Sequence, residues 1–235
     1  MKIQNAVAFV TGANRGLGLQ LVRELIARGA KKVYAGMRNP VDLGIPGVVS
    51  VKLDVTNADD VATAAVQCVD TTLLINNAGI APFLGYFEPK TIDVTREIFE
   101  TNFYGVIRVS QAFAPILANN GGGAIINVLS VASWISTAMI APYAASKSAV
   151  WSFTNALRTD VRPHGTQVLG LHVGFMDTDM TREIQMPKTD PHVVAVQTLD
   201  ALEAGQEEVL ADDITRQVKQ GLSANPAVYL APIAR

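Results

Sequence analysis

Several residue types are scarce in this sequence, and each scarcity excludes a class of protein. Cys68 is the only cysteine among 235 residues, so an intrachain disulfide framework is impossible. Charged residues make up only 17% of the chain and the net charge is −2, which offers no attraction to nucleic acid or to an anionic membrane. No run of about 18 apolar residues occurs, so we expect no transmembrane helix.

The N-terminal residues lack a long apolar segment with a small-residue cleavage site, so no signal peptide is expected and a cytoplasmic location follows. The three histidines do not fall at the spacing of metal ligands, and there is no second cysteine to join them. We therefore expect no metal site. Cys68 lies in a segment of helical period and is interpreted as a small core residue rather than a nucleophile.

Hydrophobic residues, in contrast, make up 49% of the chain, enough to form a core without metal or disulfide support. They occur mainly in short continuous runs, as in strands buried on both faces of a parallel sheet. Strands are predicted at residues 6–10, 32–35, 48–53, 72–75, 124–129, 168–173 and 208–210. Helical periods occupy residues 17–28, 58–68, 93–119, 143–162, 192–204 and 214–222.

This alternation predicts an α/β fold with right-handed crossovers. The expected architecture is a doubly wound parallel sheet of about seven strands with helices on both faces. No linker or shift in composition divides the chain, so residues 1–235 are predicted to form a single Rossmann-fold domain.

A glycine-rich turn follows the first predicted strand. Its glycines have the spacing Gly-x-x-x-Gly-x-Gly, and a helix begins immediately afterwards. Glycine permits a tight turn and close approach of the backbone to a pyrophosphate, while the helix start supplies unpaired N–H groups and partial positive charge. After the first strand of an α/β chain, this turn predicts a dinucleotide site. Its residues are Gly12, Asn14, Arg15, Gly16, Leu17 and Gly18.

Two arginines indicate which dinucleotide binds. A carboxylate about 20 residues after the turn would hold the ribose 2′-hydroxyl of NAD, but the second strand leads into Arg38 and the next acid is Asp42. The guanidinium groups of Arg15 and Arg38 can instead grip a 2′-phosphate. We expect NADP as the preferred cofactor, with NAD as the alternative if both arginines are merely solvated surface residues.

Three further motifs follow in order along the chain. The segment Asn76-Asn77-Ala78-Gly79 closes the fourth strand, Ser130 ends the fifth, and Tyr143 and Lys147 stand at the start of a long helix. Together with the glycine turn they resemble the short-chain dehydrogenase/reductase family, in particular its NADP-type carbonyl reductases, from about residue 4 to residue 180. The ordered combination is far more specific than any single motif.

The chemistry of this set can be argued from its residues. Tyr143 and Lys147 share one helix face. A free phenol has a pKa of about 10. A neighbouring ammonium and the positive nicotinamide of the oxidised cofactor are expected to lower that value, so Tyr143 would be the acid in reduction and the base in oxidation. Ser130 would donate a hydrogen bond to the carbonyl oxygen, and the resemblance implies that Asn102 completes the set by helping a water reach Lys147.

The resemblance also implies further contacts with the cofactor. Asp54, followed by Val55, would accept from the adenine amino group, although Asp54 could instead cap its own turn. Residues 76 to 79 would line the dinucleotide, partly through backbone atoms. After the sixth strand Val173 replaces the usual proline of the family, but the residues that would position the nicotinamide remain. They are Gly174, Met176 and Thr178, and Tyr143 and Lys147 would also contact the cofactor.

The loops after the predicted strands carry mostly apolar side chains. Phe83, Trp134, Phe175 and Met180 are expected to line the substrate pocket, with no cluster of Arg or Lys to hold a phosphate tail. The expected substrate is a small hydrophobic ketone, aldehyde or secondary alcohol, reduced or oxidised with NADP(H). The alternatives are an NAD-dependent secondary alcohol dehydrogenase and a non-catalytic nucleotide-sensing protein.

The long helical segments 93–119 and 143–162 resemble the pair that forms the main dimer contact in this family. The glycine-rich segment that usually follows the seventh strand in this family is not recognisable here. Because that region often forms one of the tetramer interfaces in the family, its absence weakens the case for a tetramer. We expect a homodimer or a homotetramer.

Overall fold

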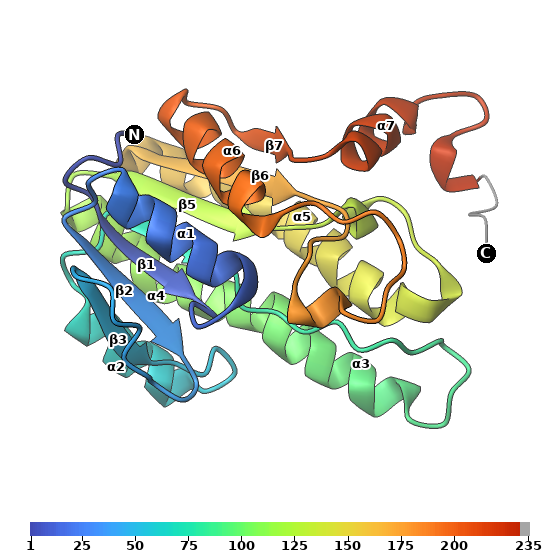
Figure 1. The fold of residues 1–235 in the computed structure, drawn as a ribbon, viewed down its shortest axis with the longest axis horizontal. Coiled ribbons are helices and arrows are strands. Elements are labelled where there is room, and N and C mark those ends of the chain that lie inside the picture. The colour runs from blue at the N-terminus through green and yellow to red at the C-terminus, as the bar shows by residue number, and fades with distance from the viewer. Residues whose placement is uncertain (231–235) are drawn as a thin grey trace.

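The computed structural model describes residues 1–230, and its centre is a sheet of seven parallel strands (Figure 1). The strands lie in the order β3-β2-β1-β4-β5-β6-β7, so the strand order reverses between β1 and β4. Residues 231–235 of the predicted domain lie outside the described residues. The strands are β1 (Val7–Thr11), β2 (Lys32–Met37), β3 (Val48–Lys52), β4 (Leu73–Asn76), β5 (Gly123–Val128), β6 (Thr166–His172) and β7 (Glu208–Leu210).

Helices cover both faces of this sheet, and two hydrophobic cores lie between the layers. Residues of β1 alternate between them: Ala8 and Val10 pack with α1 and α6, whereas Val7 and Phe9 pack with α2, α4 and α5. This arrangement confirms the predicted doubly wound Rossmann fold. The helices are α1 (Gly16–Ala27), α2 (Ala58–Gln67), α3 (Thr91–Phe99), α4 (Gly105–Asn119), α5 (Ala141–Val161), α6 (Pro191–Glu203) and α7 (Asp213–Gly221).

Most predicted strands and helices are confirmed within two residues at each end, but the single helix predicted over residues 93–119 is wrong. A π-helical turn, Glu100–Tyr104, separates α3 from α4. The side chain of Asn102 in this turn bonds to the backbone of Ile80, a contact distant in sequence. Hydrophobic periodicity cannot reveal a π-helical turn inside a helix, because the apolar pattern continues on both sides of the turn.

The carboxyl ends of the parallel strands meet at one edge of the sheet, toward the right of Figure 1. The loops that follow β4, β5 and β6 gather there, and they contain most of the residues singled out in the sequence. This is the edge at which doubly wound sheets bind ligands. Among the helices of residues 1–230, none combines the length and the apolar character needed to cross a bilayer.

Candidate active site

The turn between β1 and α1 requires its glycines. Gly16 has a φ of +53°, in the left-handed region, and a Cβ on Gly18 would lie 2.2 Å from the carbonyl oxygen of Gly12. Arg15 precedes the helix without capping it, and the first turn of α1 holds no acidic residue. The first N–H groups of α1 are therefore left for an external acceptor, and this donor set fits a pyrophosphate.

The segment after β4 is tied to this turn by hydrogen bonds. The Asn77 amide donates to the carbonyl oxygens of Thr11 at 2.9 Å and Gly12 at 3.1 Å, and the Thr11 hydroxyl accepts from the N–H groups of Asn77 and Ala78. The Asn76 amide is buried and donates to Ser110 and Asn127. Because both Asn side chains are used inside the protein, contacts of this segment with a dinucleotide would come from its backbone, Ala78 and Gly79.

Asp54 and Arg38 lie together beyond β2 and β3. The Oδ1 atom of Asp54 accepts from the N–H of Thr56 at 2.9 Å and from its hydroxyl at 2.7 Å, so Asp54 does cap its own turn. Burial raises the pKa of Asp54, but the Thr56 hydrogen bonds and the charges of Arg38 and Lys52 outweigh burial and lower it. Among residues 1–230 no group bonds Oδ2, so that oxygen can still accept from an adenine amino group.

Ser130 lies two residues beyond the end of β5, in a tight turn, rather than at the end of the strand itself. Its hydroxyl oxygen accepts from the N–H of Ala132 at 3.1 Å, and its own N–H donates to the hydroxyl of Ser133 at 3.4 Å. Ser130 is 6% exposed, and its hydroxyl lies 3.4 Å from the carbonyl oxygen of Val173. A backbone N–H of its own turn and a carbonyl oxygen just after β6 therefore orient this hydroxyl.

Tyr143, in the first turn of α5, lies close enough to Ser130 for the serine to affect its pKa. Burial raises the pKa of Tyr143, and a hydrogen bond with the Ser130 side chain acts in the opposite direction. Lys147 donates to the carbonyl oxygen of Val128 at 2.7 Å, with its Nζ atom 5.8 Å from the centre of the Tyr143 ring. Burial lowers the pKa of Lys147 to about 8. In the protein alone, the predicted lowering of the Tyr143 pKa by Lys147 is not seen, because burial of Tyr143 dominates; one N–H of Lys147 donates to the backbone.

Asn102 joins the loop after β4 to α5. Its Oδ1 atom accepts from the N–H of Ile80 at 2.8 Å, and its amide donates to the carbonyl oxygen of Ile80 at 2.9 Å and to Ser146 at 3.1 Å. The Ser146 hydroxyl donates in turn to the carbonyl oxygen of Tyr143 at 2.7 Å. Both amide N–H groups of Asn102 are thus occupied within the protein. If Asn102 takes part in proton transfer, it must do so through the backbone atoms of the π-helical turn rather than through its side chain.

Comparison with known proteins agrees with this geometry: a family model described as short chain dehydrogenase matches residues 6–189. The chain belongs to the short-chain dehydrogenase family. It is an oxidoreductase, and it resembles several characterised members. Gluconate 5-dehydrogenase of Gluconobacter oxydans is 38% identical over 199 residues, covering 77% of this chain and 75% of that protein. The 3-oxoacyl-(acyl-carrier-protein) reductase of Vibrio cholerae is 33% identical over 194 residues, covering 78% of this chain and 79% of that one.

Solved structures of the family agree with the fold. A short-chain dehydrogenase from Burkholderia cenocepacia, in complex with NADP, superposes with a TM-score of 0.93 at 39% identity and covers 99% of this chain and 100% of its own. A member from Burkholderia phymatum, in complex with NAD, has a TM-score of 0.86 at 22% identity over the whole of both chains, which shows a shared fold.

In this short-chain dehydrogenase the segment after β6 reaches back to the glycine turn. A Cβ on Gly16 would lie 3.4 Å from the Cγ2 atom of Thr178. The N–H of Gly174 donates to Asp212 at 2.6 Å, and the carbonyl oxygen of Met176 accepts from the Thr181 hydroxyl. The three residues predicted to position the nicotinamide therefore lie on a segment held at both ends.

Three of the four side chains predicted to line the substrate pocket lie on loops at this edge. Phe83 and Met180 are each about half exposed, at 47% and 46%, and Phe175 is half-buried. The N–H of Leu84 donates to the carbonyl oxygen of Met139 at 2.9 Å, so the loops after β4 and β5 are tied together. These loops thus present an apolar surface to solvent at the carboxyl edge of the sheet.

Trp134, the fourth of these side chains, is engaged by the protein itself. Its ring stacks on His172 with the ring centres 3.9 Å apart, and it meets Trp151 edge-on. His172 is fully buried, with its Nδ1 atom 3.1 Å from the carbonyl oxygen of Ser130. The spacing of the histidines bears only on metal binding and predicts no role for His172. One signal in the sequence pointed to His172: it ends the sixth strand, which lies beside the fifth strand, and the fifth strand leads to Ser130.

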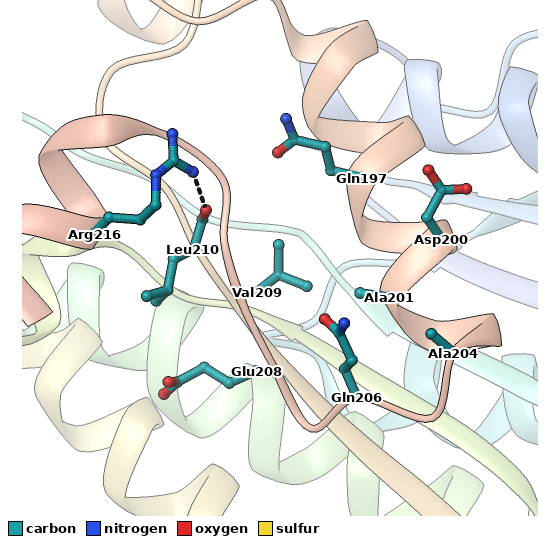
Figure 2. Close-up of a pocket in the computed structure, with 9 residues that line it drawn as sticks. All are labelled: Gln197, Asp200, Ala201, Ala204, Gln206, Glu208, Val209, Leu210 and Arg216. Atoms are coloured by element: carbon teal, nitrogen blue, oxygen red, sulfur yellow. Dashed lines mark hydrogen bonds between the residues drawn. The ribbon is translucent and has the colours of Figure 1, made fainter.

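An open pocket of about 520 Å³ lies elsewhere, between α6, β7 and α7 (Figure 2). None of the predicted site residues lines it. Its charged groups already have partners: Asp200 pairs with Arg28 at 2.7 Å, and Arg216 donates to the carbonyl oxygen of Leu210 at 2.8 Å. Within residues 1–230 no three acidic, histidine or cysteine side chains are grouped to hold a metal ion. Cys68 is buried, which raises its pKa to about 12 and makes a thiolate nucleophile unfavourable.

Proposed function

We propose that this short-chain dehydrogenase transfers a hydride between NADP(H) and the carbonyl or hydroxyl carbon of a small hydrophobic ketone, aldehyde or secondary alcohol. The observation that carries the proposal is that Ser130 lies close enough to the Tyr143 phenol to lower its pKa, with Nζ of Lys147 5.8 Å from the centre of the Tyr143 ring. A hydrogen-bond donor and a proton donor at one point are what carbonyl reduction requires.

NADP is the preferred cofactor in this proposal. Arg38 is exposed just after β2, where an acid would bind the ribose of NAD, and Arg15 is exposed at the start of α1. Arg15 lies 3.4 Å from Asp179 with most of its side chain in solvent, so it can turn to a 2′-phosphate. The 39% identical structure from Burkholderia cenocepacia was solved with NADP, which supports this choice.

The protein residues divide the remaining work. When bound, the dinucleotide supplies or accepts the hydride. Burial keeps the pKa of Tyr143 high, so the phenol is protonated and can donate its proton to the carbonyl oxygen in reduction. Ser130 donates a hydrogen bond to the same oxygen as negative charge develops there. Lys147, with its pKa lowered to about 8, can bind a ribose hydroxyl and return a proton toward Tyr143.

The surrounding loops favour an apolar substrate. Residues 80–87 and 131–142 contain no Lys or Arg. In the loop after β6, Arg182 is paired with Asp179, and Lys188 donates to the carbonyl oxygen of Arg182 at 3.4 Å. A sugar acid or an acyl-carrier substrate, as the names of two relatives specify for those proteins, would be favoured by cationic partners, and residues 80–87 and 131–142 contain none. A small hydrophobic carbonyl compound needs only the apolar surface and the two hydroxyls.

The test is a panel of hydrophobic ketones, aldehydes and alcohols assayed with NADPH and with NADH. We expect a higher kcat/KM with NADPH, and Tyr143→Phe should lower kcat on the order of a hundredfold or more because proton transfer is lost. The variant should still bind NADPH, which fluorescence titration checks. Unchanged turnover in Tyr143→Phe would refute the role of the phenol.

Two other outcomes point to the other hypotheses. A clear preference for NADH would identify an NAD-dependent secondary alcohol dehydrogenase. Tight NADPH binding without turnover of any compound in the panel would indicate a nucleotide-sensing protein that retains the fold.

A further inference from the structure

A buried histidine lies directly behind Ser130. His172 is the last residue of β6, and its ring is completely excluded from solvent. Its Nδ1 atom is 3.1 Å from the carbonyl oxygen of Ser130, and its Nε2 atom has no hydrogen-bond partner among residues 1–230. A carbonyl oxygen can only accept, so the proton of a neutral ring must lie on Nδ1. The histidine is then a donor aimed at the backbone of the serine.

The ring is held in this position by an aromatic neighbour from the same turn as Ser130. Trp134 stacks on it with an angle of 18° between the planes. The N–H of Trp134 donates to the carbonyl oxygen of Val131, which closes the short turn that begins at Ser130. The turn therefore contacts His172 twice, through a carbonyl oxygen at its start and an aromatic ring at its end.

The C-terminal helix α7 completes the cluster. The Nζ atom of Lys219 lies 4.7 Å from the centre of the Trp134 ring and 2.9 Å from the Oε1 atom of Glu208 on β7. Glu208 also lines the open pocket described above, and Figure 2 shows its carboxylate directed away from Gln197 and Asp200 of that pocket. The Oε1 atom of Glu208 is 3.6 Å from Nε2 of His172, which is too far for a hydrogen bond. The charged groups around the imidazole are thus Glu208, Lys219 and, on α5, Lys147.

Polar atoms in this cluster are left unsatisfied. Neither Nε2 of His172 nor Nε1 of Trp134 finds a partner within the described residues, and burying such atoms costs free energy. An apolar side chain at position 172 would avoid the cost at Nε2, but the Ser130 carbonyl would then keep one donor instead of two, the backbone N–H of Ser133 at 3.0 Å. Burial also lowers the pKa of His172 to about 4, so the ring stays neutral at pH 7.

We propose that His172 is a positioning residue for Ser130. Its Nδ1–H holds the peptide carbonyl of the serine, Trp134 fixes the plane of the imidazole, and Lys219 of α7 covers the tryptophan. The orientation of that peptide determines where the serine hydroxyl points, and a small displacement of a catalytic group lowers the rate strongly. This inference rests on the proposed catalytic role of Ser130.

Two variants of His172 separate the hydrogen bond from the ring. His172→Phe keeps an aromatic ring against Trp134 but removes the donor, whereas His172→Asn places an amide N–H close to the position of Nδ1 and removes the ring. With NADPH and phenanthrenequinone, a flat hydrophobic diketone, we expect His172→Phe to lower kcat about tenfold with KM changed less than twofold. His172→Asn should retain most of kcat. Equal losses in both variants would overturn the proposal.

A double-mutant cycle distinguishes positioning from a general structural effect. If His172 acts through the serine, His172→Phe should have no further effect on the residual kcat of Ser130→Ala. The same tenfold loss in both backgrounds would mean that His172 supports the fold rather than the serine, and would overturn the proposal. If His172→Phe does not fold, His172→Gln replaces it, because its amide reaches the position of Nε2 rather than Nδ1 and should also lower kcat.

A measurement without turnover tests the geometry directly. Nitrogen-15 NMR of histidine-labelled wild-type protein at pH 7 should show His172 with Nδ1 protonated and Nε2 bare. The opposite tautomer would exclude a donor to the Ser130 carbonyl and refute the proposal. This result does not depend on the substrate, so a failure of the proposed function, seen as no turnover by the wild type, remains distinguishable from a failure of this inference.

Discussion

Burial shifts the pKa of three side chains around Ser130, in each case toward the neutral form. It raises the pKa of the Tyr143 phenol and lowers those of Lys147 and His172, to about 8 and about 4. The common cause is removal of water from the charged form. At pH 7 this leaves the phenol as a proton donor and the imidazole as a fixed hydrogen-bond donor, which are the roles proposed for them.

The low pKa of His172 predicts how stability depends on pH. An unfolded chain binds a proton at an ordinary histidine pKa of 6.5, whereas the folded protein does so only near 4. The contribution of His172 to the free energy of unfolding should therefore fall by about 3 kcal/mol as the pH is lowered from about 6.5 to about 4, and should change no further below that. Urea unfolding of wild type and His172→Phe across this range measures the difference.

The matched control for this measurement is His192→Gln, since His192 is exposed on α6. It should follow the wild type at every pH. A His172→Phe variant whose stability falls with acid as steeply as that of the wild type would show that the buried imidazole does not titrate as expected.

Among the elements, the break between α3 and α4 has a mechanical consequence for the site. The π-helical turn carries Asn102, which satisfies both backbone groups of Ile80 and reaches Ser146 on α5. Three segments distant in sequence are thus joined at one amide. Single π-helical turns within helices often occur at functional sites. Here the turn holds the loop after β4 against the helix of Tyr143.

Asn102→Ala should weaken this junction. It leaves the N–H and the carbonyl oxygen of Ile80 without their partner, and we expect the free energy of unfolding to fall by about 2 kcal/mol or more. Asn155→Ala, a change at an exposed position on α5, is the control and should stay within about 0.5 kcal/mol of the wild type. Urea unfolding measures both, and equal stability of the two variants would contradict the structural role of Asn102.

At the scale of the whole molecule, the glycine turn connects β1, α1 and the segment after β4, so cofactor binding should stabilise the entire fold. NADP at about a hundred times its dissociation constant should raise Tm by about 5 to 10 °C. NAD at the same concentration should raise it less. In Arg38→Ala the two cofactors should become more alike, because one partner of the 2′-phosphate is lost.

Differential scanning fluorimetry records these shifts. Equal shifts with NADP and NAD in the wild type would argue against the proposed preference, and an Arg38→Ala variant that still favours NADP as strongly would leave Arg15 as the deciding residue. The expected homodimer or homotetramer involves further copies of the chain and stays a prediction.

The sequence by itself determined the elements and the motifs, because both are encoded locally. Continuous apolar runs located the seven strands, and helical periods located the helices, within two residues at most ends. The parallel topology then implied that the glycine turn, Ser130 and Gly174 would gather at one edge. Tyr143 and Lys147 could be paired from spacing alone because four residues is one helical turn.

Only the tertiary structure decided which partners the side chains take. Asn102 reaches back 22 residues to Ile80, and His172 meets Ser130 across 42 residues. Lys219, on the C-terminal helix α7, covers Trp134. Sheet register and helix packing set these contacts, and residue spacing carries no record of them. For the same reason Trp134, expected to face a substrate, packs on a histidine, and Lys147, expected to lower the pKa of Tyr143, is turned to the backbone of β5.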